Sequence, residues 1–301
     1  MHETSGDFFR KHLTILWVGL GALALVIAVW LLWFNRVDTN AERVFWGVVQ
    51  NSLSSQSVTV QAHQQSKQGN MDQYIQLGFG PDKVAHSLTN LTQGTAMVKT
   101  ENISTPKGDY TRYLTLQAAQ KGKDGKPVDT SKIVGVWANT TAQSDSKDKQ
   151  VPQLFSQVLL QLSMPVGNLP VAQRNDLLHE MRTGQVYTTS FTKLKRQHKD
   201  GRLQYIYDVQ LQPILYVRLM KDYAKAMGLH SLDAVDPNKY SGSRPVTVHW
   251  TVDVHARQLV GVDYGNGHQE TYSGWGLAMH TPTPAKTISA AELQKRLSVL
   301  Q

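Results

Sequence analysis

One strand-like segment holds the side chains of this chain that are best suited to chemistry. His249, Asp253 and His255 share a face of the segment 246–254, whose valines alternate with polar residues. Imidazole nitrogens and carboxylate oxygens are ligands that zinc accepts. The alternation that turns the valines toward a core also turns these three side chains toward water. We therefore expect a solvated strand face here rather than a metal site.

A further acidic residue, Asp208, lies between two tyrosines in another alternating segment, 203–211. An inward carboxylate could act as a general acid or base. Alternation places Asp208 opposite the apolar side chains, so we expect a surface residue. The sequence contains none of the GxSxG, P-loop, HExxH and GxGxxG patterns that carry nucleophilic, phosphate-binding, zinc or dinucleotide chemistry. We therefore expect a protein that is not an enzyme and that holds no cofactor.

The elements that position these residues follow an apolar run, Leu13–Phe34, which contains no charged residue. At about 1.5 Å per residue, this run is long enough to cross a hydrocarbon core of roughly 30 Å. Trp17 lies near one end, and Trp30 and Trp33 lie near the other, where amphipathic rings suit the headgroup level. The run predicts a single transmembrane helix over 13–34.

Two alternatives to this anchor follow from the same residues. A cleaved signal peptide has a shorter apolar region of about 7–15 residues and a small-x-small cleavage site, whereas residues 33–36 here are large. A buried core helix is the other alternative, and the tryptophans on an all-round apolar surface argue against it. The chain contains no cysteine, which excludes a lipidated anchor, a disulfide scaffold and a thiolate metal site.

Charges beside the run say little about its orientation. Arg10 and Lys11 flank one side, and Arg36 and Arg43 flank the other, so the positive-inside rule is nearly balanced. A short tail before a long folded body favours an N-terminus inside the cell. We therefore expect a single-pass protein of the cell membrane with a cytoplasmic tail over 1–12, an extracytoplasmic domain over 37–280, and a Pro-containing tail with a short helix over 281–301.

The body of the chain is basic, with a formal net charge of +8 and a pI near 9.5. Such a body is attracted to anionic lipid headgroups or to an acidic wall polymer. Nucleic acid is the other common partner of basic proteins. The sequence has no nucleic-acid motif, and its Lys and Arg residues are spread through loops, so we expect no nucleic-acid binding.

Periodicity of the apolar residues predicts an α+β fold with one large, curved antiparallel sheet. Helices are expected at 41–49, 151–164, 171–181 and 213–227, with a last short one after the capping box at 289–292. Strands are expected at 58–62, 74–79, 96–98, 109–117, 185–194, 203–211, 246–254, 259–264 and 268–273. The segment 132–138 is apolar on both faces and predicts a strand in the centre of the sheet.

Apolar helices packed against one curved sheet can close over a cavity instead of filling it. Such a pocket, lined by aliphatic and aromatic side chains, suits an acyl chain. The candidate lining residues are Trp137, Leu154, Phe155, Val158, Leu159, Leu215, Leu219, Tyr223 and Trp250. For each of these residues, packing in an ordinary core is the alternative reading.

The C-terminal third resembles a known family. The strand at 246–254, the continuation from Asp253 to Tyr264, the step Tyr272-Ser-Gly-Trp-Gly and the proline-containing tail resemble the LolA-like lipoprotein carriers, most of all the LppX/LprG-type lipoproteins. The resemblance covers about 50 residues. It implies a half-barrel sheet wrapped over helices around a hydrophobic cavity that carries lipids outside the cytoplasmic membrane. Those relatives have a lipidated cysteine or are soluble, whereas here a transmembrane helix replaces the lipid anchor.

These observations favour a membrane-tethered extracytoplasmic protein that binds or transfers a lipid or a lipidated molecule in a hydrophobic cavity. The alternative is a non-enzymatic sensor or assembly subunit that has a packed core and binds another envelope protein. A hydrolase is a third possibility, which would need a nucleophile and a base converging in a cleft. The expected partners are therefore the membrane and a lipid or acyl chain, or, in the alternative reading, a second envelope protein.

Overall fold

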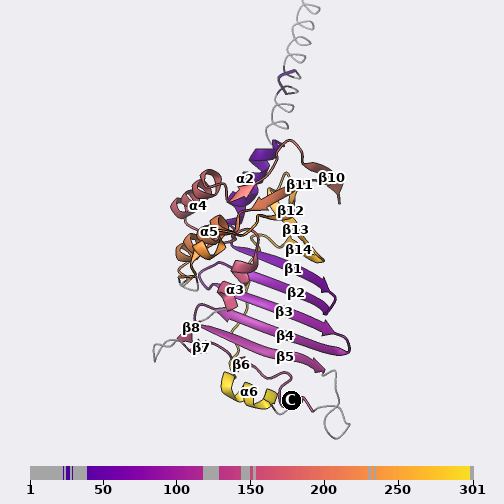
Figure 1. Cartoon of the computed structure of the whole chain (residues 1–301), viewed down its shortest axis with the longest axis vertical. Helices are drawn as coiled ribbons and strands as arrows, with labels where there is room; N and C mark the ends of the chain where they lie inside the picture. Colours follow the sequence, from indigo (N-terminus) through magenta and orange to yellow (C-terminus); the bar gives the residue numbers. More distant parts are fainter. Residues whose placement is uncertain are drawn as a thin grey trace, which may run out of the picture.

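The chain folds as an α+β protein with one large, open and mostly antiparallel sheet, as its periodicity predicts (Figure 1). The structure is a computed structural model, and it describes residues 39–117, 129–143, 150–151, 154–229, 232–233 and 235–298, together with residues 23, 25–27 and 29. Most of the predicted transmembrane segment 13–34 lies outside the described residues. Within the described part, no helix has the length and apolar character needed to cross a membrane.

The sheet runs in the order β10-β11-β12-β13-β14-β1-β2-β3-β4-β5-β6-β15, with the short β9 pairing with β11. Neighbouring strands are antiparallel except for β15 and β6, which are parallel. The strands are β1 (Ser57–Ser66), β2 (Gly69–Gly78), β3 (Val84–Gln93), β4 (Ala96–Thr105), β5 (Gly108–Gln117), β6 (Ala138–Asn139), β9 (Tyr187–Thr188), β10 (Lys195–Lys199), β11 (Arg202–Leu211), β12 (Val246–Asp253), β13 (Gln258–Gly265), β14 (His268–Ser273) and β15 (Ile288–Ser289). A separate two-stranded sheet pairs β7 (Ala142–Gln143) with β8 (Gln150–Val151).

Helices lie on one face of the sheet, which we call the inner face; we call the opposite face the outer face (Figure 1). The helices are α2 (Ala41–Ser52), α3 (Leu154–Gln161), α4 (Val171–Thr183), α5 (Pro213–Ala226), the short 3-10 helix η1 (Pro237–Tyr240) and α6 (Ala290–Ser298). In Figure 1, α2, α4 and α5 gather near β11–β14, whereas α3 lies over one end of the strands β3 and β4. The strands β2–β5 therefore leave much of their inner face without a helix.

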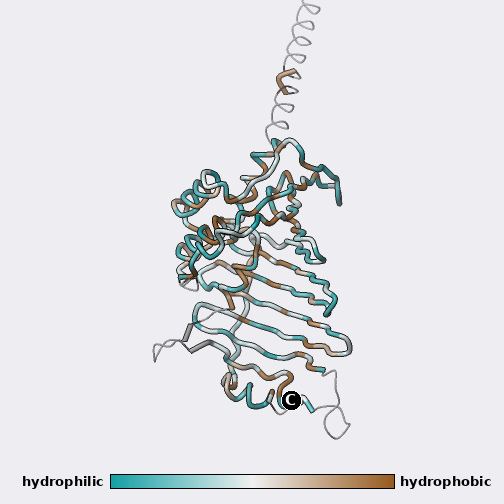
Figure 2. Tube along the Cα trace, in the orientation of Figure 1, coloured by the Kyte–Doolittle hydropathy of each residue, from teal (hydrophilic) through white to brown (hydrophobic). Residues whose placement is uncertain are grey.

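Aromatic side chains fill the space between α2 and the strands beside it. The ring of Phe45 from α2 stacks on Trp250 of β12, with centroids 5.4 Å apart. Tyr187 approaches the same tryptophan at 5.0 Å, and Tyr207 lies edge-on to Phe45 at 5.4 Å. Each of these residues is buried. Figure 2 shows hydrophobic residues alternating with hydrophilic ones along the strands. This half of the molecule therefore has a packed aromatic core.

The start of α2 is fastened to the sheet by two tyrosine hydroxyls. Tyr205 donates a hydrogen bond to the carbonyl of Thr39, and Tyr207 donates one to the carbonyl of Ala41, each at 2.8 Å. Asn40 caps the helix by accepting a hydrogen bond from the backbone N–H of Arg43 at 3.0 Å. The helix predicted at 41–49 thus begins where expected, at a fixed place on the body.

Three local predictions differ from the structure. The segment 132–138, expected in the centre of the sheet, forms turns and leads into β6, next to the sheet edge. Gly135 has a φ of +82°, which breaks the extended backbone, and Ile133 is buried in a small separate core with Leu293 of α6. The strand expected at 185–194 is reduced to β9. The strand β3 was not predicted, because its apolar residues do not alternate regularly.

Candidate functional site

The nine residues expected to line a cavity fall into different environments. Phe155, Leu159, Leu219, Tyr223 and Trp250 are fully buried in the main core. Leu215 is partly buried and packs against the same core. The ring of Trp137 lies under the guanidinium of Arg112, whose Cζ is 4.7 Å from its centroid. Whether any of the nine contacts a lipid stays a prediction.

The other two expected residues, Leu154 and Val158, do line a cavity. It has a volume of about 100 Å³ and lies between α3 and the inner face of β2–β4. The sheet side of the cavity is formed by Gln73, Ala85, Ser87, Asn102 and Ser104, and the helix side also includes Gln157 and Gln161. The cavity is much smaller than the roughly 300–1,000 Å³ of typical ligand pockets. It can therefore hold only a small part of a lipid.

The hairpin between β4 and β5 holds the first turn of α3. A carboxylate oxygen of Asp109 accepts a hydrogen bond from the backbone N–H of Leu154 at 3.3 Å, and the hydroxyl of Ser104 accepts one from the N–H of Phe155 at 2.9 Å. Ser104 also donates a short hydrogen bond to Asp109. The first N–H groups of a helix have no partner within the helix, so these side chains satisfy them. The sheet thereby fixes α3 on its inner face.

Replacing Ser104 with alanine is expected to lower the free energy of unfolding by about 1 kcal/mol, the usual cost of losing a capping hydroxyl. Guanidinium unfolding followed by tryptophan fluorescence measures this. Ser298→Ala is the control, because Ser298 is exposed at the end of α6 and should change stability by less than about 0.5 kcal/mol. Equal effects of the two substitutions would contradict the capping role.

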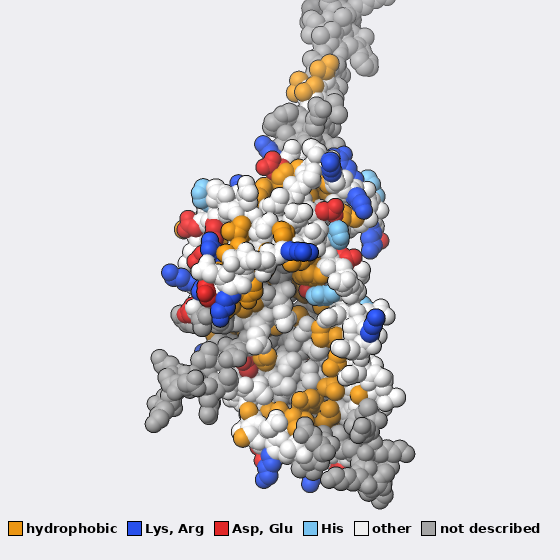
Figure 3. Space-filling view, viewed as in Figure 1, with side chains coloured by type: hydrophobic (Ala, Val, Ile, Leu, Met, Phe, Trp, Pro, Cys, Tyr) orange, Lys and Arg blue, Asp and Glu red, His pale blue; other side chains and the backbone are white. Residues whose placement is uncertain are grey.

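A row of apolar side chains crosses the inner face of β2–β5 and ends at Leu116, which packs against the small core of Ile133, Ala138 and Leu293. The strand register places Met71 of β2 opposite Leu91 of β3, Leu91 opposite Val98 of β4, and Val98 opposite Leu116 of β5. Leu91 is 45% exposed, and the other three are partly exposed. They share the face of α3 because Ala85 and Leu91 lie an even number of residues apart on β3. Figure 3 shows apolar side chains on these strands, beside the helices.

Between this apolar row and α3, the inner face is polar. One register row contains Gln73, Thr89, Thr100 and Tyr113, and the next contains Ile75, Ser87, Asn102 and Thr111. Asn102 donates to the hydroxyl of Ser87 at 3.3 Å and accepts from Thr111 at 2.8 Å. Ser87 and Asn102 also line the small cavity under α3, and Ile75 and Ser87 are buried, so only the row of Gln73, Thr89, Thr100 and Tyr113 lies between α3 and the apolar row.

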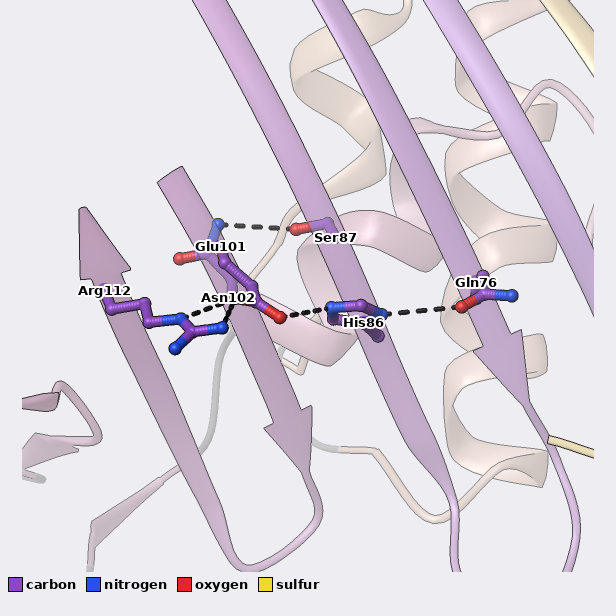
Figure 4. Close-up of polar contacts among 6 residues, drawn as sticks. All are labelled: Gln76, His86, Ser87, Glu101, Asn102 and Arg112. Carbon is purple, nitrogen blue, oxygen red and sulfur yellow. Dashed lines mark hydrogen bonds and ion pairs between the residues drawn. The ribbon is translucent and has the colours of Figure 1, made fainter. Parts of the chain in front are cut away.

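On the outer face, four charged or polar side chains form a ladder across β2–β5 (Figure 4). The Nε2 of His86 lies 2.8 Å from a carboxylate oxygen of Glu101, and its Nδ1 lies 3.5 Å from the side-chain oxygen of Gln76. Arg112 donates to the other oxygen of Glu101 at 2.5 Å through Nε and also through Nη2. Glu101 is 12% exposed, so solvent screens this pairing only partly.

A histidine paired with a carboxylate is also part of many nucleophilic sites. Here the serine next to His86 in the sequence, Ser87, points to the inner face, where it binds Asn102 (Figure 4). Alternation along the strand therefore separates the base from that hydroxyl. The arrangement fits a structural role, because each pair of opposite charges on neighbouring strands stabilises a sheet by about 0.2–1 kcal/mol. It ties together the strands whose inner face is uncovered.

The four polar residues considered first as metal ligands or as a general acid or base lie on the outer face or in a turn. They are Asp208, His249, Asp253 and His255. His249 and Asp208 face each other across β11 and β12, with Nδ1 and Oδ1 2.7 Å apart, and both are largely exposed. Asp253 was expected on a solvated face but is buried, because it accepts hydrogen bonds from the backbone N–H groups of His255 and Ala256, at 3.0 and 2.9 Å. Among the residues that the structure describes, no three His, Cys, Asp or Glu side chains are grouped as metal ligands.

A buried carboxyl, Glu270, was not singled out from the sequence. It lies on β14, is 5% exposed and accepts hydrogen bonds from the hydroxyls of Tyr272 at 2.6 Å and Tyr264 at 3.0 Å. Burial raises the pKa of Glu270, while the two hydroxyls and the nearby His268 act in the opposite direction. Burial likewise raises the pKa of Tyr272 well above its ordinary value. The only sequence signal was a glutamate at an inward position of an alternating strand.

No protein-family model matches this sequence, and no curated protein matches it. Among solved structures, the fold is similar to the crystal structure of LprF from Mycobacterium bovis, with 15% sequence identity and a TM-score of 0.40. The match covers 82% of this chain and 97% of the LprF chain.

Proposed function

We propose that this chain is a non-enzymatic, membrane-tethered protein of the cell envelope that binds an acyl chain of a lipid or lipidated molecule on the uncovered inner face of β2–β5. The observation that carries the proposal is the apolar row of Met71, Leu91, Val98 and Leu116. An apolar row that stays accessible on one face of a sheet offers a binding surface to an apolar ligand. The proposal places the body outside the cytoplasmic membrane and assigns the chain to the lipoprotein carriers that its C-terminal third resembles.

The dimensions of the row suit an acyl chain. Four neighbouring strands span three spacings of about 4.8 Å, so the row is roughly 14 Å across. Each methylene that leaves water for an apolar surface contributes about 0.8 kcal/mol. Full removal of eight methylenes from water would contribute about 6 kcal/mol, and a chain on this open face, which keeps one side in water, would gain less than that. The polar row beside the apolar row offers hydroxyl and amide groups to the polar end of the same molecule.

The packed aromatic core favours the alternative function, in which the domain binds another envelope protein. Trp250, Phe155 and Tyr223 are fully buried, so the helices beside β11–β14 enclose no large void around these residues. A lipid must then lie on the open face rather than inside the body. A protein partner could use the same face through its polar row, with no lipid involved. The experiment below separates the two.

Leu91→Gln is expected to reduce lipid binding at this face by at least fivefold. The full chain would be reconstituted in phosphatidylcholine nanodiscs containing a lipid with a diazirine on its acyl chain, irradiated, and mapped by peptide mass spectrometry. We expect cross-links on β3 and β4 in the wild-type protein. Because Leu91 is surface-exposed, its replacement should change stability by less than about 0.5 kcal/mol.

Leu88→Gln is the matched control, since Leu88 is the same residue type on the same strand but faces the outer side. Its cross-link yield should stay within twofold of the wild type. A loss of yield in Leu88→Gln with none in Leu91→Gln would move the lipid to the outer face and overturn the proposal. Cross-links confined to residues 13–34 would support a protein-binding function with a membrane anchor instead.

A further inference from the structure

A larger pocket lies where α2, the end of α4, β9 and the turn between β12 and β13 meet. Its volume is about 860 Å³. It is lined by Asn40, Glu42, Arg43, Trp46, Gly47, Gln50, Arg182, Gln185, Tyr187, Thr188, Thr189, Phe191 and Arg257. None of these residues belongs to the open face of β2–β5, so the pocket is a second feature of the molecule.

Three arginines and one carboxylate set the charge of this pocket. Arg43, Arg182 and Arg257 face it, with Glu42 as the acidic lining residue. The guanidinium of Arg182 lies over the ring of Trp46, with its Cζ 5.0 Å from the centroid. A guanidinium that stacks on an aromatic ring still presents its N–H groups at its edge. The lining therefore carries more cationic than acidic side chains, beside an amphipathic ring.

The position of Arg257 is built into the fold. Asn51 of α2 donates to the backbone carbonyl of Arg257 at 3.0 Å, which fastens the β12–β13 turn to the helix. The side chain of Arg257 then passes over Gly47, where an added Cβ would lie 2.6 Å from its Cδ. A glycine at position 47 thus leaves room for this arginine along α2.

The pocket also contains a hydroxyl suited to a ligand. The Oγ1 of Thr189 is buried and has no hydrogen-bond partner among the residues that the structure describes. A buried hydroxyl without a partner is costly, so such a group often marks the place of a ligand or a water. Thr189 lies in the same lining as the arginines, whose guanidinium donors suit the oxygens of a phosphate.

The pocket lies at the end of the body where the chain enters from its N-terminal run. Thr39 is fixed to Tyr205 by a 2.8 Å hydrogen bond, and it follows Phe34 by five positions. Five extended residues span at most about 17 Å, so a membrane that held the run would lie close to this end of the body. The exposed basic strand β10, Lys195–Lys199, lies at the same end (Figures 1 and 3).

We propose that this pocket binds the phosphate of an anionic lipid headgroup in the membrane that anchors the chain. This binding would fix the orientation of the folded domain relative to the bilayer. The inference rests on the membrane anchor of the proposed function. Arginine guanidinium groups match phosphate oxygens in a two-point geometry, and Trp46 suits the interface between headgroups and acyl chains. The guanidinium groups of Arg43, Arg182 and Arg257 supply the donors for such a phosphate.

The test uses the full chain in nanodiscs of equal parts phosphatidylglycerol and phosphatidylcholine. Native mass spectrometry of the ejected protein counts the lipids that it retains. We expect the wild-type protein to retain phosphatidylglycerol over phosphatidylcholine by at least fivefold. The variant R43Q/R182Q/R257Q should fall to a ratio near one. If that triple variant does not fold, R43Q/R182Q is expected to reduce the ratio at least twofold.

The control variant R202Q/R218Q/R244Q removes the same charge from three exposed arginines outside the pocket and should keep the wild-type ratio. An equal fall in the control would show that net charge alone attracts the lipid, which overturns the inference. Incorporation into nanodiscs without any preference for phosphatidylglycerol would overturn it while leaving the anchor intact. A chain that does not enter nanodiscs would overturn the anchor and this inference together.

Discussion

Replacing Trp250 with alanine is expected to lower the free energy of unfolding by about 3–5 kcal/mol, the usual cost of removing a large buried ring. Trp250 is fully buried, stacks on Phe45 at 5.4 Å and lies 5.0 Å from Tyr187. Its indole N–H donates to the hydroxyl of Ser163 at 3.1 Å. The substitution removes these ring contacts and leaves a cavity in the packed half of the body. Urea unfolding followed by far-ultraviolet circular dichroism measures the change.

His249→Ala is the control for this prediction, because His249 is the preceding residue on β12 and faces the opposite side of the sheet. Its pairing with Asp208 is exposed, and exposed ion pairs contribute about 0–1 kcal/mol. A stability change below about 1 kcal/mol in Trp250→Ala would mean that the ring lines a space which tolerates its loss. That outcome would revive the enclosed lipid cavity expected from the sequence.

Local patterns in the sequence predicted many of the elements. The unbroken alternation of 246–254 corresponds to β12, and Pro213 begins α5, which ends at Ala226 near Gly228. The turn at Gly265–Gly267 has positive φ at all three residues, as its Gly-Asn-Gly sequence predicts. These features depend on contacts between near neighbours in the chain, so the sequence determines them locally.

Features that depend on distant parts of the chain could not be predicted in this way. The segment 132–138 has the composition of a central strand, but Ile133 is buried against α6 near the far end of the sequence. Whether Leu219 and Tyr223 line a cavity or fill a core depends on how α5 meets α4 and the sheet. The hydropathy of these two residues is the same whether they line a cavity or fill a core. Packing of the whole domain decides between them.

The apolar row on the open face escaped prediction for a related reason. Met71, Leu91, Val98 and Leu116 lie on four strands whose neighbouring residues are mostly polar, so no single strand shows a pattern. A partial signal was present, because Leu91 and Val98 flank the turn at Gly94, which has a φ of +58°. A hairpin placed at that glycine would have paired them. The pairing of Met71 with Leu91 required β3, which was missed.

Replacing Glu270 with alanine is expected to lower the free energy of unfolding by about 2–5 kcal/mol, because the hydroxyls of Tyr264 and Tyr272 lose their acceptor inside the fold. Glu270→Gln keeps one acceptor oxygen and should cost less. It also removes a titrating group, so the difference between it and the wild type should depend on pH. Urea unfolding of both proteins at a series of pH values measures that dependence.

The direction of this dependence follows from the raised pKa of Glu270 in the folded state. The folded protein holds the proton of Glu270 more tightly than the unfolded chain does. The stability that this adds to the wild type is therefore fully present below the unfolded pKa, near 4.5. This added stability is lost as the pH rises through the pKa of Glu270 in the folded protein. Glu270→Gln should therefore gain stability relative to the wild type as the pH rises from about 4 toward neutrality.

Glu292 provides a control of opposite sign. It is an exposed carboxyl of α6 that accepts a hydrogen bond from Arg296 at 2.8 Å, and this contact lowers its pKa. Its contribution is present above the unfolded pKa and is lost as the pH falls, so Glu292→Gln should lose stability relative to the wild type as the pH rises. If both variants shifted in the same direction, burial would not control the titration of Glu270. The tyrosine hydroxyls would then hold its charged form, and the carboxylate would be a fixed negative charge inside the domain.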